Sequence, residues 1–189
     1  MKKSTNEEVK KRGLTTRQIA LTATFLAINV AVGAFSSRLG TQKLTMTYTI
    51  CFLAGYVLGP FGGGLVGGGA DLLGCFINGF APNPIILISS CLIGVIPGII
   101  KYVRPKKDYA ITPYIHCLAS YIVVYVVCTT FINTAGLYLL SGFNERYDSF
   151  FGYVAYRLST QTGVWALNLI LTMIIIPIIK KIKTLTNKK

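Results

Sequence analysis

The sequence predicts an all-α, polytopic membrane protein built as a bundle of six transmembrane helices. Of its 189 residues, 52% are hydrophobic and only 13% are charged, whereas about a quarter of the residues in soluble domains are charged. The apolar residues form long runs, such as 84–100 and 114–140. Runs of about 18 or more apolar residues are typical of membrane helices, so the composition and the runs indicate the same class.

Six spans follow from these runs and from the breakers between them. Thr15 is suited to cap the first helix. Gly59-Pro60 ends the second span, and the turn-rich stretch NGFAPNP ends the third. The charged stretch RPKKDY and the polar stretch SGFNERYDS precede the fifth and sixth spans. The expected spans are 16–37, 47–58, 62–77, 84–103, 112–140 and 150–179.

The last two spans are unusually long, because each has close to 30 residues. At helical rise each would measure about 45 Å, whereas the hydrocarbon core of a bilayer is about 30 Å thick. We therefore expect these helices to tilt, break or project from the membrane.

The positive charges predict the orientation. Most of the 19 Lys and Arg residues gather in 2–17, 101–107 and 180–189, which is the pattern of cytoplasmic segments. Both termini and the 101–108 loop are then cytoplasmic, which divides the chain into a tail at 1–14, a membrane domain at 15–182 and a tail at 183–189. Because the net charge of +13 is distributed in this way, no nucleic-acid partner is expected.

Enzyme and metal motifs are not found in the sequence. The five cysteines lie inside apolar runs and form no CxxC pair, so they indicate small buried hydrophobic side chains and no metal site. The single histidine, His116, has no HExxH, GxSxG or paired-carboxylate context, and no Walker motif occurs. We expect no enzymatic activity and no cofactor.

Asp71 is an acidic residue within an apolar, glycine-rich span. It lies eleven residues after Pro60, about 16 Å along a helix and hence near mid-membrane. A charge at this depth costs from about 3 to over 10 kcal/mol, so Asp71 is protonated, paired or facing a cavity. A structural polar role in helix packing is the leading interpretation, with a coupling-ion role and a direct ligand contact as alternatives.

A polar stripe on the sixth span predicts a ligand-binding wall. Arg157, Gln161, Trp165 and Asn168 are spaced by four, four and three residues and therefore share one helical face. Arg157 lies about 34 Å from Lys180 along a helix, at the outer membrane boundary, and its fork suits a carboxylate or phosphate. Packing by Trp165 and snorkelling by Arg157 are the alternative interpretation. Further polar candidates expected at outer depth are Asn83, Asn133, Tyr138, Arg38, Lys43 and Tyr48.

Small residues indicate close helix contacts at two places. Ala23, Ala27 and Ala31 recur every four residues in the first span, a pattern that lets another helix approach closely in lipid. This stripe can contact either a partner protein or the other spans. The block GPFGGGLVGGGADLLG has no GK[ST] motif, so close helix packing is favoured over phosphate binding.

The chain resembles the substrate-binding S components of energy-coupling factor (ECF) vitamin transporters over residues 14–182. The resemblance is based on the length, the six spans, ATFLAINVA in the first span and GYVLGPFGGGLVGGGADLLG across the second and third. AYRLSTQ at the start of the sixth span is similar to the folate branch. An S component has six helices with both ends inside, and binds its vitamin at the outer face.

The resemblance implies specific partners. It implies a multi-pass protein of a bacterial plasma membrane that docks through Ala23, Ala27 and Ala31 on an ECF transmembrane coupling subunit. Two cytoplasmic ATPase subunits would power import of the small-molecule vitamin across the lipid bilayer. Folate is the expected ligand, with pantothenate, cobalamin and a queuosine precursor as alternatives. An ion-coupled secondary transporter of a small organic anion is the competing class, although no internal repeat supports it.

Overall fold

The computed structural model describes residues 15–35, 37–39, 42–44, 46–102, 111–140 and 149–186. The predicted N-terminal tail and the last three residues lie outside this part. The elements in chain order are α1 (Thr16–Ala34), β1 (Ser37–Leu39), β2 (Gln42–Leu44), α2 (Thr47–Leu58), α3 (Pro60–Ile77), α4 (Pro84–Tyr102), α5 (Thr112–Val123), η1 (Val124–Asn133), α6 (Thr134–Leu140) and α7 (Phe150–Thr186).

The predicted fold class, a helical membrane bundle, is confirmed. Five helical segments of the described residues are long and apolar enough to cross a membrane, and α2, with 12 residues, is a shorter apolar helix. The α5, η1 and α6 segments form one continuous helix, Thr112–Leu140. The predicted orientation of the termini stays a prediction.

The ends of the first and last spans differ from expectation. The helix α1 stops at Ala34, and Ser37, the last residue of the predicted span, instead begins β1, which pairs antiparallel with β2. At the other end of the chain, α7 continues to Thr186 as a single helix of 37 residues. The long sixth span therefore projects beyond a bilayer core of about 30 Å or crosses it at a tilt.

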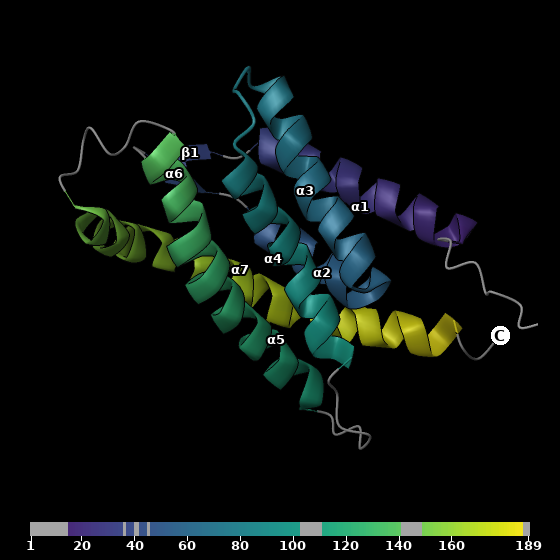
Figure 1. Cartoon of the computed structure of the whole chain (residues 1–189). Helices are drawn as coiled ribbons and strands as arrows, with labels where there is room; N and C mark the ends of the chain where they lie inside the picture. Colours follow the sequence, from purple (N-terminus) through teal and green to yellow (C-terminus); the bar gives the residue numbers. More distant parts are fainter. Residues whose placement is uncertain are drawn as a thin grey trace, which may run out of the picture.

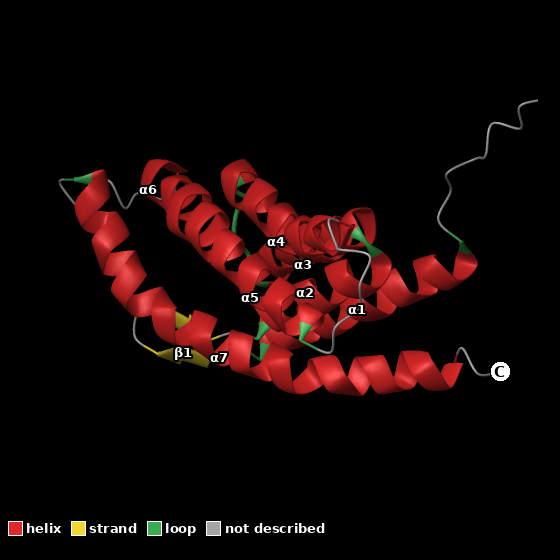
Figure 2. Cartoon of the chain, turned by 90° about the horizontal axis from the view of Figure 1, so that it is seen from below, coloured by secondary structure: helices red, strands yellow, loops and turns green. Residues whose placement is uncertain are grey.

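The helices form a layered arrangement with α2 and α4 at its centre. In Figure 1, α4 lies between the α5–α6 helix and α3, while α1 lies on the far side of α3. Figure 2 shows α7 along one side of the other helices, where it contacts α2, α5, α6, η1 and β2. Elements from both halves of the chain thus meet at α2.

Local signals explain the helix ends. Thr15 caps α1 as predicted, because its side chain accepts a hydrogen bond from the Gln18 backbone N–H at 3.3 Å and Gln18 reaches back in a capping box. Between α2 and α3, Gly59 adopts a φ of 88°, which favours glycine. Pro60 then begins α3, where a missing N–H costs nothing.

The glycine block packs α3 against α4, as predicted. A Cβ added to Gly63 would lie 2.2 Å from the Gly94 carbonyl oxygen, and one added to Gly67 would lie 2.1 Å from the Ser90 carbonyl oxygen. Both neighbours are backbone atoms, so neither helix could yield without moving away. Small residues of this kind let helices associate in lipid, where no hydrophobic force drives them together.

A buried polar network joins α2, α5 and α7. Asn168, on α7, is fully buried, and its Oδ1 accepts hydrogen bonds from the Thr49 backbone N–H at 3.2 Å and from the Thr49 hydroxyl at 3.0 Å. The Tyr121 hydroxyl donates to the Asn168 carbonyl oxygen at 3.1 Å. Beside this network lies an apolar cluster of Phe52, Cys117, Tyr121 and Ile176. These contacts hold α7 against the centre of the bundle.

Candidate substrate-binding site

A cavity of about 370 Å³ lies between α1, α2, α3, α4 and η1. Its volume falls in the range of about 300–1,000 Å³ that is usual for small-molecule sites. It combines apolar walls with several polar side chains. The polar and thiol-bearing residues of its lining are Asn29, Thr47, Tyr48, Cys51, Asp71, Cys75, Asn78, Ser90 and Asn133.

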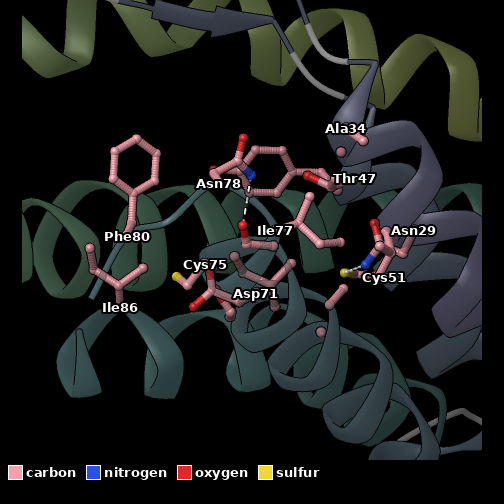
Figure 3. Close-up of a pocket in the computed structure, with 18 of the residues that line it drawn as sticks. Asn29, Ala34, Thr47, Cys51, Asp71, Cys75, Ile77, Asn78, Phe80 and Ile86 are labelled. Carbon is pink, nitrogen blue, oxygen red and sulfur yellow. Dashed lines mark hydrogen bonds between the residues drawn. The ribbon is translucent and has the colours of Figure 1, made fainter. Parts of the chain in front are cut away.

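Asp71 lies in the wall of this cavity. Figure 3 shows Asp71 and Cys75 of α3, and Asn78 at its C-cap, on one side, while Asn29 reaches in from α1 beside Cys51. The four-residue spacing of Asp71 and Cys75 places them along one helical face, and Asp71 is half-buried there. A cavity gives a mid-membrane carboxylate a polar environment, which reduces its cost. The position is compatible with ligand contact as well as with the structural role predicted for Asp71.

Asn29 is a cavity residue that the sequence argument did not single out. Its exposed fraction is 2%, and its Nδ2 donates to the Cys51 sulfur at 3.3 Å. Its Oδ1 is buried and has no hydrogen-bond partner among the described residues. The available signal was an asparagine in an otherwise apolar span. The regular spacing of the alanines instead indicated the opposite face of the helix as the functional one.

Tyr48 lies in the cavity wall and Arg157 lies within electrostatic range of it. Tyr48 lines the cavity, and its hydroxyl forms a 3.2 Å hydrogen bond with the Thr129 hydroxyl of η1. The Arg157 guanidinium, on α7, lies within electrostatic range of the Tyr48 phenol. Arg157 is half-buried, and its buried Nε has no hydrogen-bond partner within the part of the chain described. The electrostatic influence of this cation thus reaches one residue of the cavity wall.

The rest of the predicted α7 stripe packs within the bundle. The Trp165 indole N–H donates to the Tyr121 carbonyl oxygen at 2.9 Å, and its ring lies 5.3 Å from that of Tyr125. Asn168 belongs to the buried network described above. Gln161, one turn after Arg157 along α7, is half-buried. The stripe shares one face, as predicted, but Trp165 and Asn168 engage neighbouring helices there. A ligand role for Gln161 and Trp165 stays a prediction.

The other polar candidates are distributed over several elements. Asn133 lines the cavity from η1. Asn83 accepts from the Ile85 N–H at 3.0 Å, as a cap of α4, and donates to the Gly136 carbonyl oxygen at 2.8 Å. The Tyr138 ring packs 5.5 Å from that of Phe150 and 6.1 Å from that of Tyr153. Of these, Asn133 is the one that the structure brings to the cavity.

The binding-site candidates Arg38, on β1, and Lys43, on β2, lie opposite each other in the antiparallel strand pair. Their side chains lie outside the described part of the structure. The strand β2 contacts α7, the helix that carries Arg157. Binding roles for Arg38 and Lys43 stay predictions.

The alanine stripe of α1 lies on the outside of the bundle. Ala23, Ala27 and Ala31 are exposed, whereas Thr22 and Asn29 are buried on the opposite face. Within the described part of the structure, the stripe is therefore not packed against the other spans, which was one of its two interpretations. It is accessible to a lipid or to another protein.

Comparison with known proteins identifies the family. A family model described as the ECF-type riboflavin transporter, S component, matches residues 13–155. The chain belongs to this family of ECF S components. It is thus a substrate-specific subunit of an ECF vitamin transporter, the predicted class, and membership in a transporter family favours this class over an ion-coupled carrier or an enzyme.

A solved structure supports the same fold. The structure titled "Crystal structure of FolT bound with folic acid" matches with a TM-score of 0.66 and 23% sequence identity, covering 84% of this chain and 92% of that one. No curated protein sequence gives a significant match.

Proposed function

We propose that this S component binds a folate at the cavity and delivers it across a bacterial plasma membrane. An ECF transmembrane coupling subunit and two cytoplasmic ATPase subunits complete the transporter in this proposal. The observation that carries it is the cavity of about 370 Å³ with Asp71, Asn29 and Asn133 in its wall. The likeness to a folic-acid-bound FolT of the same fold supports the choice of ligand.

The polar groups favour folate over the other vitamin that the comparisons name. Asp71 and Asn29 supply acceptor oxygens on one side, and Arg157 supplies a cation near Tyr48. Folate has a pteridine ring with neighbouring N–H donors and a glutamate tail with carboxylates, so it complements both groups. Riboflavin, named by the family model, has a single imide N–H and a neutral ribityl chain. It is the second candidate because of that match.

A binding measurement on the purified chain tests the proposal directly. We expect folic acid to raise the melting temperature in detergent, without ATP, and to give a saturable isotherm by calorimetry. A ligand present at 100 times its Kd stabilises the folded state by about 2.7 kcal/mol. Riboflavin, pantothenate, cobalamin and queuosine precursors complete the panel. Binding of riboflavin alone would transfer the proposal to that vitamin, and a folded chain that binds none of them would contradict it.

The exposed alanine stripe leads to a separate prediction about docking. Ala27→Leu adds a branched side chain to the centre of the stripe, which would keep a partner helix from close approach. We expect vitamin uptake by cells that express the complete transporter to fall at least tenfold, while vitamin binding by the isolated chain stays unchanged. Ala27→Ser, which remains small, is the control and should retain uptake. Normal uptake with Ala27→Leu would exclude the stripe as the docking surface.

A further inference from the structure

The helix α1 has two chemically different faces. The exposed face carries Ala23, Ala27 and Ala31, whereas the bundle face carries the buried side chains of Thr22 and Asn29. Thr22 donates to the Gln18 carbonyl oxygen of its own helix at 2.8 Å. Asn29 instead extends away from α1 toward Cys51 and lines the cavity. Asn29 is the polar side chain among the four α1 residues that line the candidate binding site, Asn29, Val30, Gly33 and Ala34.

Among the described residues, only one of the two polar atoms of the Asn29 carboxamide has a hydrogen-bond partner. Its Nδ2 has the Cys51 sulfur as a weak partner, while its Oδ1 is shielded from solvent and has no partner among the described residues. Leaving a buried polar atom unpaired is costly, so nearly all such atoms in native proteins have a partner. This oxygen has no partner among the described residues, and Asn29 lines the cavity. A molecule bound in the cavity would supply the missing hydrogen bond.

We propose that Asn29 is a ligand-contacting residue whose carboxamide oxygen accepts a hydrogen bond from an N–H group of a heteroaromatic ring in the cavity. This inference rests on the proposed function of the same cavity. It makes α1 part of the binding site in addition to being the helix with the exposed alanine stripe.

The surrounding side chains define which chemistry the ring must have. Asp71 contributes further acceptor oxygens to the same cavity from α3. Ile77, Ile86 and Ile93 contribute apolar surface for the faces of a planar ring. A ring with two or more N–H donors along one edge, such as a 2-amino-4-oxopteridine, fits this arrangement. A ring that offers only acceptors would leave the Asn29 oxygen without a partner among the described residues.

The contact has a consequence for the mobility of α1. Only 11% of the residues in its apolar window are buried, and its main contacts in the described part of the structure are to α2 and α3. Segments with few buried contacts open at low free energy. A ligand hydrogen-bonded to Asn29 adds a contact near the middle of α1 and would restrict the motion of the face that carries the alanines.

Asn29→Ala, compared with Thr22→Ala, tests this inference. Thr22 is buried on the same face of α1, two turns away, and does not line the cavity. With calorimetry in detergent, we expect Asn29→Ala to weaken binding of folic acid by about 5- to 30-fold, the loss typical of a neutral buried hydrogen bond. Pteroic acid, which has the pteridine but no glutamate, should lose affinity by the same factor. Thr22→Ala should change both affinities less than twofold.

Hydrogen exchange on the unmodified chain gives a second measurement that needs no variant. Peptides from residues 22–34 should become more protected when folic acid is added. If the chain binds folic acid but Asn29→Ala keeps its affinity, or if these peptides show no added protection, the contact is disproved while the proposed function stands. If the chain binds neither folic acid nor riboflavin, both proposals fail. Should Asn29→Ala not fold, the exchange result decides.

Discussion

Replacing Arg157 by alanine is expected to weaken folic acid binding by about 100-fold and to leave the chain folded. Hydrogen bonds to charged groups contribute about 1.5–3 kcal/mol, and the arginine fork can hold a carboxylate through two bonds. The Nε of Arg157 is buried and unpaired among the described residues, so truncation removes an unsatisfied group. The change should therefore act on affinity and have little effect on the free energy of unfolding.

Calorimetry with two vitamins and a conservative variant separates charge from geometry. Arg157→Lys keeps the charge but loses the fork, so an intermediate loss of about tenfold is expected. Riboflavin has no carboxylate, so any riboflavin binding should change less than threefold in Arg157→Ala. An equal loss for both vitamins would indicate that Arg157 shapes the site in some other way. Unchanged folic acid affinity would remove Arg157 from the site.

Much of the helical framework could be predicted because its signals are local. Apolar runs and breakers located α2 to α6 and the start of α7 to within a few residues, and the threonine cap of α1 is read from four consecutive residues. The glycine block was equally informative, since its close spacing has few structural uses other than helix contact. These features depend on the residues themselves and little on what lies opposite.

The features that sequence reasoning missed depend on tertiary contacts. The antiparallel pair β1–β2 follows the first span and was not predicted, because its short strands contain no clear alternation. The π-helical segment η1 has ordinary apolar composition. In a π-helix each backbone hydrogen bond spans five residues instead of four. The side-chain hydroxyls of Thr130 and Thr134 also donate to carbonyl oxygens five residues earlier, at 2.9 and 3.1 Å. Segments of this type occur often at functional sites, and η1 places Asn133 in the cavity wall.

In the candidate site, too, local spacing could be predicted and tertiary contacts could not. The mid-membrane depth that helical rise gives Asp71 stays a prediction, whereas the spacing of four, four and three residues put Arg157 and Asn168 on one face of α7. Spacing cannot tell which neighbour that face meets, and Asn168 proves to bond Thr49 at 3.0 Å. Asn29 was missed for the converse reason. In an apolar helix, the face turned toward a cavity is selected by the surrounding helices, and no periodic pattern in the sequence marks it.

Gly63→Ala is expected to destabilise the fold by about 3 kcal/mol, at the upper end of the usual cost of overpacking. The added Cβ would lie 2.2 Å from the Gly94 carbonyl oxygen and 2.7 Å from the Gly55 Cα. Because both are backbone atoms, α3 would have to separate from α2 and α4. For a chain of this size, the melting temperature in detergent should fall by roughly 6–12 °C.

Gly74→Ala on the same helix is the matched control, since a Cβ there meets nothing within 4 Å. Alanine stabilises a helix by roughly 0.5–1 kcal/mol relative to glycine, so the control should melt at the same temperature or slightly higher. Equal melting of Gly63→Ala and Gly74→Ala would contradict the close α3–α4 contact. The contact also positions the cavity, because Asp71 and Ser90 line it from these two helices. Separating α3 from α4 should therefore weaken folic acid binding together with stability, whereas Arg157→Ala should lower affinity alone.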